Sequence, residues 1–399
     1  MAADRRGWVI ASAVAPLVLL AALVWVIGKH GTGVEFSAPA PLEKLDFLRV
    51  EFRPGEIVAH VMNSGPEPVT IGAAQIGWTN RASWDFAVEP GPTLPRLGRA
   101  RVTIPYPWLP GEPYEIALIS STGLAFLHDV EIAQETPQAG RMMGPFALIG
   151  LYVGVIPVYL GLMWLPFLRR LRPRAYDFLL SLTLGLLVFL GIDALAEGIE
   201  TAGRVPGPYQ GVAVLAMGLL LTVLILQGVG TAARRLGAGK GEAHQAAVLS
   251  WMIAFGIGVH NLGEGLAIGG AYALGEVGLG TLLVLGFMIH NVTEGVAIVA
   301  PLTRTGASVT QIAGLGFLAG VPTILGTWIG GVSYSDLWSV LFMGIGAGAV
   351  FQVVYAIARH MAGRRAAEGG ALPALSLRHV SGFAVGLLMM YVTGLAVVT

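Results

Sequence analysis

The sequence contains no cysteine among its 399 residues. Disulfide bridges and thiolate metal ligands are therefore excluded, and histidine, carboxylate and amide groups remain as candidate ligands. Charged residues are also scarce, at 12% of the chain against about 25% in a typical soluble protein. With a mean hydropathy of +0.71, this composition indicates an integral protein of the lipid bilayer. The net charge of zero gives no indication of nucleic acid as a partner.

The first long uncharged stretch lies near the N-terminus. Residues 8–28 follow Asp4-Arg5-Arg6 and are numerous enough to cross a hydrocarbon core of about 30 Å. The stretch is longer than the apolar core of most signal peptides, and its small residues Ala11-Ser12-Ala13 lie at its start, where cleavage does not occur. We therefore expect residues 1–28 to form a retained membrane anchor.

Residues 29–141 have the composition of a soluble β domain. Turn pairs such as Pro54-Gly55 and Pro110-Gly111 separate short β-prone runs at 57–63, 69–78, 84–88, 101–104, 114–120 and 126–132. This spacing is typical of an immunoglobulin-like or cupredoxin-like β-sandwich. A blue-copper site is excluded because it needs a cysteine ligand. His60 and His128 could share another metal, although lone strand histidines are more often ordinary surface or core residues.

The remainder of the chain, 142–399, alternates apolar segments with short polar connections. Eight segments are long enough to span a membrane as helices: 145–168, 177–196, 209–232, 246–272, 278–302, 311–332, 337–358 and 380–398. The predicted fold is an all-α polytopic membrane protein, in which an eight-helix bundle follows one anchor helix and a β-sandwich domain.

Basic residues mark alternate connections of the predicted bundle. The connections on one side of the membrane carry Arg169, Arg170, Arg172, Arg174, Arg234, Arg235, Lys240, Arg304, Arg359, Arg364, Arg365 and Arg378. The short loops on the opposite side contain only Arg204. Cytoplasmic loops are enriched in lysine and arginine. This pattern predicts a cytoplasmic N-terminus, with the β domain and the C-terminus outside the cytoplasm.

Two segments thirty residues apart have nearly the same sequence. Residues 259–268 contain His260 and Glu264, and residues 289–298 contain His290 and Glu294. Positions i and i+4 of a helix differ by about 40° in direction, so each pair lies on one face. Both motifs fall near the middle of their segments, where an ionisable group without a partner costs several kcal/mol. Two imidazoles and two carboxylates predict a metal site that suits tetrahedral Zn²⁺, and also Fe²⁺, Mn²⁺, Co²⁺ or Cd²⁺.

Two further sets of polar residues in the apolar segments have either a metal-related or a purely structural role. Asn261 and Asn291 either share the motif glutamates with a second ion or form hydrogen bonds to a neighbouring helix. Asp193, Glu197 and Glu200 form an i, i+4, i+7 series near the end of the second segment. This series either concentrates cations at an aqueous mouth or is simply a solvated helix end.

The doubled motif resembles that of the ZIP (Zrt/Irt-like) family of zinc and iron permeases, in its prokaryotic branch. The resemblance covers 145–399 and implies eight helices, uptake of a divalent metal into the cytoplasm and a location in the inner membrane. It implies that His260, Glu264, His290 and Glu294 bind the transported metal. It also places Asn261 and Asn291 beside the two glutamates in a second site.

Three residues of the expected metal sites depart from the family pattern. The motif proline is replaced by Gly263 in one copy and by Thr293 in the other, and Thr323 stands where the sixth helix should supply a carboxylate to the second site. A hydroxyl is a poor replacement for a carboxylate ligand. We therefore expect a mononuclear or very asymmetric site.

Three other functions compete with transport. An intramembrane zinc-dependent hydrolase would use Glu264 or Glu294 as its general base, but the sequence contains no His-Glu-x-x-His motif. A haem protein would use His260 and His290 as axial ligands, with the glutamates badly placed in an apolar pocket. A metal-sensing transceptor or inactive transporter is the third, and the missing carboxylate at Thr323 keeps this alternative open. A homodimer is a possible assembly. Three roles remain open for the β domain: it would deliver metal, gate the entrance or form the dimer.

Overall fold

The computed structural model describes residues 15, 18–26, 29, 42–77, 82–130, 132–136, 139–170, 173–236, 241–273, 277–332, 334–367 and 376–398. The chain divides into a short N-terminal unit, Met1–Glu43, and a large unit, Lys44–Thr399. Most of the expected anchor lies outside the described residues. Residues 18–26 are helical, as an anchor requires, and the anchor itself stays a prediction.

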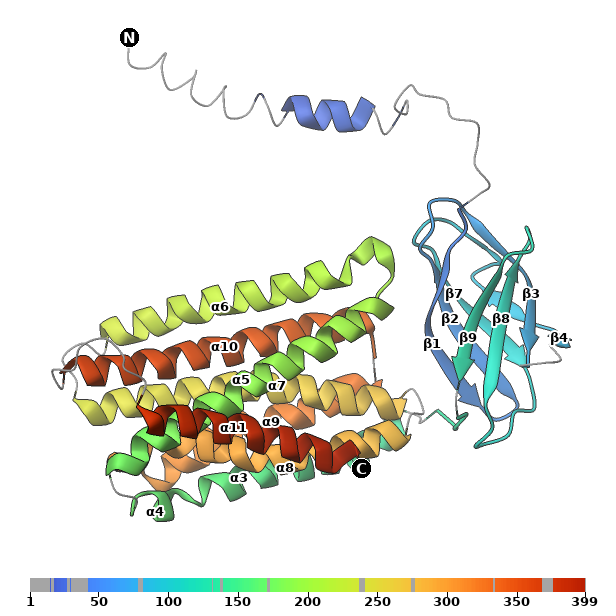
Figure 1. The fold of residues 1–399 in the computed structure, drawn as a ribbon. Coiled ribbons are helices and arrows are strands. Elements are labelled where there is room, and N and C mark those ends of the chain that lie inside the picture. The colour runs from blue at the N-terminus through green and yellow to red at the C-terminus, as the bar shows by residue number, and fades with distance from the viewer. Residues whose placement is uncertain are drawn as a thin grey trace, which may run out of the picture. The chain divides into compact units, whose positions relative to one another are not determined.

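The β domain consists of two antiparallel sheets (Figure 1). One sheet has the order β1-β2-β7-β5, formed by Leu45–Arg53, Glu56–Asn63, Arg99–Pro105 and Ala87–Glu89. The other has the order β4-β3-β8-β9, formed by Ala82–Trp84, Val69–Ile76, Tyr114–Ser120 and Ala125–Val130, and the short strand β6, Thr93–Leu94, pairs with β3. The sequence therefore predicted the β-sandwich correctly. It missed β1 and β6, and it read β4 and β5 as one strand.

Alternation of side chains explains why these strands stack as a sandwich. Ile57 and Val61 of β2 and Ile116 and Leu118 of β8 are completely buried and belong to one apolar core. On β1, Glu51 falls between the core positions Val50 and Phe52. A period of two along a strand places alternate side chains on opposite faces, so one face of each sheet supplies the core.

The first three membrane helices are described completely apart from 171–172. The first is interrupted and consists of α2 (Ala139–Gly150), the π-helical turn η1 (Leu151–Val155), α3 (Ile156–Leu162) and α4 (Leu165–Leu168). The second is α5, Pro173–Arg204, which is longer than the apolar segment 177–196 predicted. The turn η2, Gly207–Tyr209, leads into the third, α6, Gly211–Leu236.

The remaining helices are α7 (Glu242–Ala273), α8 (Val277–Val299), α9 (Val309–Val332), α10 (Asp336–Ala367) and α11 (Leu377–Val398), and the turn η3 (Ala300–Arg304) follows α8. Among the described residues, seven helices are long and apolar enough to cross a membrane. The eighth, α11, has a shorter apolar part, Leu377–Val392. The multi-pass membrane fold is therefore confirmed, whereas only seven of the eight predicted spans meet this length.

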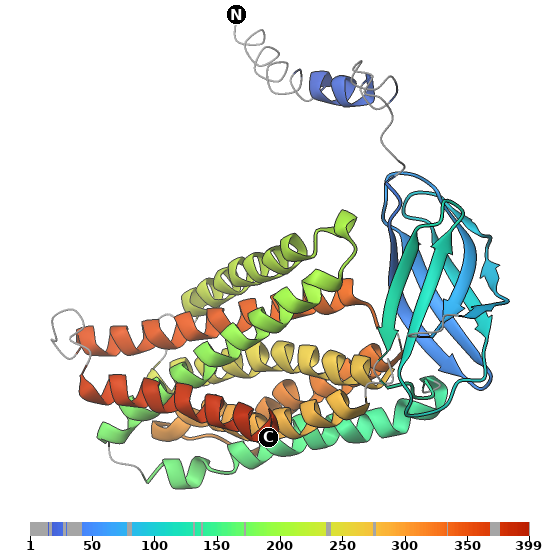
Figure 2. The same ribbon diagram turned by 45° about the vertical axis from the view of Figure 1, so that its right-hand side comes forward.

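The helices of the bundle lie side by side (Figure 2), and glycines allow several pairs of them to approach closely. On the α7–α9 contact, a Cβ atom added to Gly265 would lie 2.3 Å from the Thr323 carbonyl oxygen. On the α3–α8 contact, the corresponding distance from Gly295 to the Val158 carbonyl oxygen is 2.2 Å. Similar approaches join α5 to α11 and α6 to α10. Small residues at these contacts let backbones pack directly, which is how membrane helices associate when water does not drive them together.

Candidate metal site

The repeated motif lies in the middle of two packed helices. His260 and Glu264 belong to α7, and His290 and Glu294 belong to α8. These two helices contact each other directly. All four side chains are buried, with 8% of each histidine and 4% of each glutamate exposed. The structure thus brings the predicted ligands together inside the helical domain, where the surroundings cannot replace a missing partner with water.

Glu264 is the central group of the cluster. One of its oxygens, Oε1, lies 2.5 Å from His290 Nε2 and 3.4 Å from His260 Nε2. The other, Oε2, accepts a hydrogen bond of 3.0 Å from Asn291 Nδ2. One oxygen of Glu264 thus faces both imidazoles, and the other faces Asn291. Glu264 therefore connects the ligands of α7 with those of α8.

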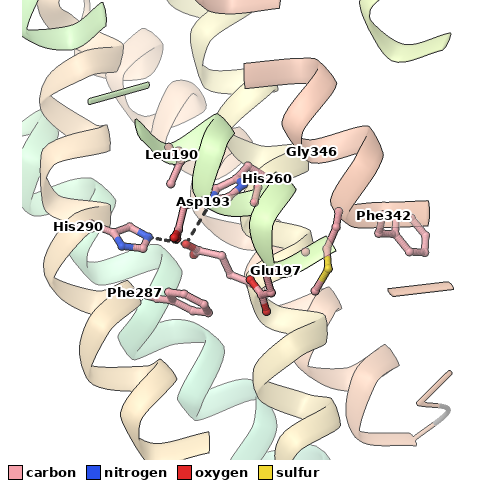
Figure 3. Close-up of a pocket in the computed structure, with 12 residues that line it drawn as sticks. Leu190, Asp193, Glu197, His260, Phe287, His290, Phe342 and Gly346 are labelled. Atoms are coloured by element: carbon pink, nitrogen blue, oxygen red, sulfur yellow. Dashed lines mark hydrogen bonds and ion pairs between the residues drawn. The ribbon is translucent and has the colours of Figure 1, made fainter. Parts of the chain in front are cut away.

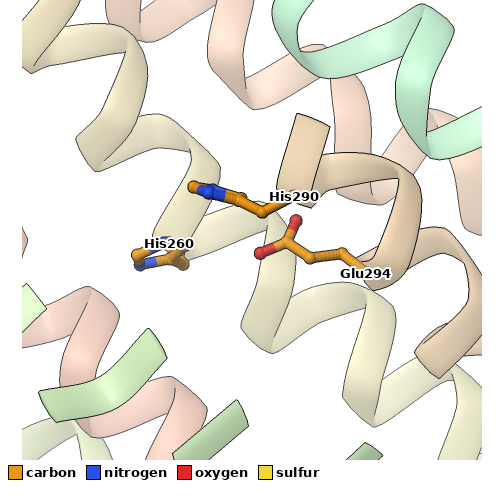
Figure 4. Close-up of side chains that lie close together, drawn as sticks. All are labelled: His260, His290 and Glu294. Atoms are coloured by element: carbon orange, nitrogen blue, oxygen red, sulfur yellow. The ribbon is translucent and has the colours of Figure 1, made fainter. Parts of the chain in front are cut away.

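The second glutamate has a different environment. Donor atoms of His260, His290 and Glu294 all lie within 4.8 Å of one another (Figure 4). Within the described chain, neither carboxylate oxygen of Glu294 has a hydrogen-bond partner, and His260 Nε2 has none. Buried polar atoms without partners carry a desolvation cost of about 1–3 kcal/mol, and more when charged. A divalent cation bound to these atoms would offset that cost.

The two motif asparagines donate hydrogen bonds to neighbouring helices. Asn261 Nδ2 donates to the Ala319 carbonyl oxygen of α9 at 3.1 Å, and Asn291 Nδ2 donates to the Val153 carbonyl oxygen of η1 at 3.0 Å. Their buried side-chain oxygens have no partner among the described residues. The side-chain nitrogens therefore form the predicted hydrogen bonds to neighbouring helices. Each side-chain oxygen keeps the lone pairs that a bound ion would need.

Prolines lie on the helices that receive these hydrogen bonds. Pro157 of α3 has no N–H group to donate to Val153, four residues earlier, and Pro322 lies inside α9 three residues after Ala319. A proline removes a helical hydrogen bond and tilts nearby carbonyl groups. The motif itself lacks the prolines that the family resemblance implies. The prolines lie on the facing helices, close to the carbonyl groups that accept hydrogen bonds from the motif asparagines.

The two residues at the motif-proline positions have separate surroundings. A Cβ atom added to Gly263 would meet no other atom within 4 Å, and Gly263 lines a pocket. The Thr293 hydroxyl donates to the His290 carbonyl oxygen of its own helix at 2.6 Å. Thr323, expected beside the second site, is completely buried, and its hydroxyl has no hydrogen-bond partner in the part of the chain that the structure describes.

A pocket opens from the cluster toward α5 and α10 (Figure 3). Besides His260, Glu264 and His290, it is lined by Leu190, Asp193, Ala194, Glu197, Gly263, Phe287, Phe342, Met343 and Gly346. Two of the three acidic residues predicted near a mouth therefore face the motif itself. Glu200 does not line the pocket: it is exposed and lies 3.9 Å from the guanidinium group of Arg204. The sequence interpretation assigned all three residues to a helix end, because the apolar segment stops at residue 196.

The β-domain histidines do not form a shared site. His60 on β2 lies 3.1 Å from Glu51 Oε1, whereas the ring of His128 on β9 stacks on Phe47 at a centroid distance of 5.0 Å. They belong to different sheets. The hypothesis of a metal bound by His60 and His128 is therefore wrong, and each histidine has an ordinary structural partner.

The fold and the cluster define a class: a multi-pass membrane protein with a buried histidine–carboxylate site between helices. Residues 231–394 match the family model described as ZIP zinc transporter. This segment includes both copies of the motif and less than half of the chain. It is similar to transporters of zinc and other divalent metals rather than to enzymes. No curated protein matches the chain.

Proposed function

We propose that this protein is a ZIP-family transporter that carries divalent transition-metal cations across a membrane, with Zn²⁺ uptake into the cytoplasm as its main activity. The observation that carries the proposal is the set of buried donor atoms at His260, Glu264, His290 and Glu294. They lie in the middle of packed helices: donor atoms of His260, His290 and Glu294 are within 4.8 Å of one another, and Glu264 Oε1 is close to both histidines. A binding position in the middle of membrane helices is typical of transporters.

The donor atoms determine which cations suit the site. Imidazole nitrogens and carboxylate oxygens bind Zn²⁺ at about 2.0–2.2 Å. The same set accepts Fe²⁺, Mn²⁺, Co²⁺ and Cd²⁺, and the absence of cysteine removes the thiolates that favour softer ions. Zn²⁺ is the proposed main substrate because two imidazoles and two carboxylates can surround it tetrahedrally. Asn261 and Asn291 are proposed to lie beside this ion, with their free oxygens directed to an adjacent position.

The orientation of the protein is part of the same proposal. The basic connections support a cytoplasmic N-terminus, with the β domain and the C-terminus outside the cytoplasm. The proposed location is the inner membrane of a cell. In this orientation Asp193, Glu197 and Glu200 lie on the outer half of α5, along the path of an incoming cation.

The direct test is uptake of ⁶⁵Zn²⁺ by proteoliposomes that contain the full-length protein. The variant His260→Ala/Glu264→Ala should lose uptake and high-affinity Zn²⁺ binding, because the remaining ligands cannot complete the coordination shell. Glu242→Ala/His244→Ala is the matched control, since it removes the same residue types from the exposed beginning of α7. Uptake at the wild-type rate by the first variant would show that the site is assigned wrongly. Zn²⁺ binding without uptake by the wild-type protein would instead identify a transceptor.

A further inference from the structure

The pocket brings carboxylates of α5 to the same space as the motif. Asp193 and Glu197 are four residues apart on α5, so they lie on one face of that helix, and both line the pocket with His260, Glu264 and His290 (Figure 3). The structure gives neither Asp193 nor Glu197 a hydrogen bond or ion pair with a described residue. Glu200, one turn further along α5, is close to Arg204 instead.

The two motif glutamates differ in their relation to the pocket. Glu294 forms a compact group with His260 and His290 (Figure 4) but does not line the pocket. Glu264 lines the pocket and contacts both histidines. The carboxylates therefore fall into two sets: Glu294, which does not line the pocket, and Asp193 with Glu197, which do. Glu264 lies between the two sets.

His260 supplies an independent indication that the pocket side binds a cation. The residue is more than nine-tenths buried and lines the pocket. Its Nε2 atom lies 3.4 Å from Glu264 Oε1 but has no hydrogen-bond partner among the described residues. Three carboxylates, those of Asp193, Glu197 and Glu264, face this pocket. Glu264 is buried, Glu197 is half-buried and Asp193 is exposed. Their like charges repel most strongly toward the buried end of the pocket, where a divalent cation is the partner that this arrangement stabilises.

We infer that Asp193 and Glu197 are the carboxylate ligands of a second divalent-cation position on the α5 side of the pocket, next to His260 and sharing Glu264 with the first position. This inference rests on the proposed function of the motif. The pair on α5 supplies carboxylates that the chain lacks at Thr323, where the side chain packs against the backbone of η1. Because its ligands are mainly oxygen atoms, the second position accepts Mn²⁺ and Fe²⁺ more readily than the first.

The test is calorimetric titration of the full-length protein in lipid nanodiscs with Zn²⁺. The wild-type protein is expected to bind two ions per chain with different affinities. Asp193→Asn/Glu197→Gln should bind one ion fewer and keep the other. His290→Ala/Glu294→Gln should lose the first ion and keep the α5-side ion. Asp177→Asn is the control, because Asp177 is a half-buried carboxylate of the same helix that does not line the pocket.

The outcomes separate the inference from the proposed function. Two ions bound by Asp193→Asn/Glu197→Gln, or a single ion in the wild type, would overturn the inference while leaving the motif site intact. Slower uptake with unchanged stoichiometry would also overturn it, because the α5 carboxylates would then only attract cations in transit. Failure of the wild type to bind any Zn²⁺ would refute the proposed function itself. Circular dichroism verifies the fold, and the single variants Asp193→Asn and Glu197→Gln serve if the double variant does not fold.

Discussion

Single hydrogen bonds distinguish the two motif asparagines, although their sequence contexts are nearly identical. Asn291 donates to both Glu264 and Val153, whereas Asn261 donates only to the Ala319 carbonyl oxygen. Residues that orient a metal ligand typically contribute about 10–100-fold in affinity. We predict that Asn291→Ala weakens Zn²⁺ binding by roughly this factor and that Asn261→Ala weakens it less. Titration of both variants with Zn²⁺ measures the difference, and equal losses would contradict the proposed positioning of Glu264.

A charged cluster in the β domain predicts acid sensitivity. The pKa of Glu51 is lowered from 4.5 to about 2, chiefly by its hydrogen bond with His60, helped by Arg53 and Arg49 against the opposing effect of burial. A group whose pKa is lower in the folded state stabilises that state above its unfolded pKa. The contribution of Glu51 is therefore complete above pH 4.5 and is lost as the pH falls toward 2.

Unfolding of the isolated β domain in urea at several pH values tests this expectation. Glu51→Gln should lower the stability at neutral pH and reduce its decrease between pH 4.5 and 2. Glu89→Gln provides the comparison, because Glu89 pairs with Arg101 on the surface, where an ion pair contributes about 0–1 kcal/mol. Identical pH profiles for the wild type and Glu51→Gln would rule out this role of Glu51.

At the residue scale, the ligand types were predictable because helix packing alone does not account for a doubled His–Glu pattern inside apolar segments. The hydrogen-bond acceptors of the asparagines were not predictable. Val153 lies 138 residues from Asn291, and nothing local to the motif indicates it. Pro157 and Pro322 were visible in the sequence, but their effect on the motif depends on which helices pack together.

At the scale of helices, close backbone contact predicts opposite effects for two neighbouring glycines of α7. A Cβ atom at Gly265 would lie 2.3 Å from the Thr323 carbonyl oxygen, whereas one at Gly263 would meet no atom within 4 Å. Overpacking costs about 1–3 kcal/mol, while alanine stabilises a helix relative to glycine by about 0.5–1 kcal/mol. We expect Gly265→Ala to lower the thermal unfolding midpoint of the detergent-purified protein and Gly263→Ala to preserve or raise it. Equal midpoints would mean that α7 and α9 are not packed through Gly265.

Helix ends were the least predictable feature of the elements. The apolar run of the second helix ends at residue 196, but α5 continues to Arg204. Its last two turns are amphipathic, with Glu197 facing the pocket and Glu200 near Arg204. Hydropathy alone therefore ends the helix too early. Strand β1 was missed for the opposite reason: its charged residues concealed an alternating pattern whose apolar half, including Val50 and Phe52, is buried.

At the scale of the whole molecule, the division into a β domain and a helical domain followed from composition. The number and order of the membrane segments were predictable for the same reason, since charged connections separate apolar runs. The pairing of helices was not predictable. It depends on which glycine-rich faces fit together, and glycines occur on nearly every helix of the chain. The neighbourhood of Asp193 and the motif is a product of that pairing.

The β domain and the helical domain have separate cores, since the buried apolar cluster of the β-sandwich and that of the helices have no residue in common. The motif ligands and the residues that line the pocket all belong to α5, α7, α8 and α10. We predict that a truncated chain beginning at Met142 folds and binds Zn²⁺ at the motif with unchanged affinity, while its uptake kinetics change because the domain that modulates access is missing. Circular dichroism and Zn²⁺ titration test the first part, and ⁶⁵Zn²⁺ uptake tests the second. Loss of Zn²⁺ binding with the helices intact would show that the β domain supplies ligands and that the two domains form one functional site.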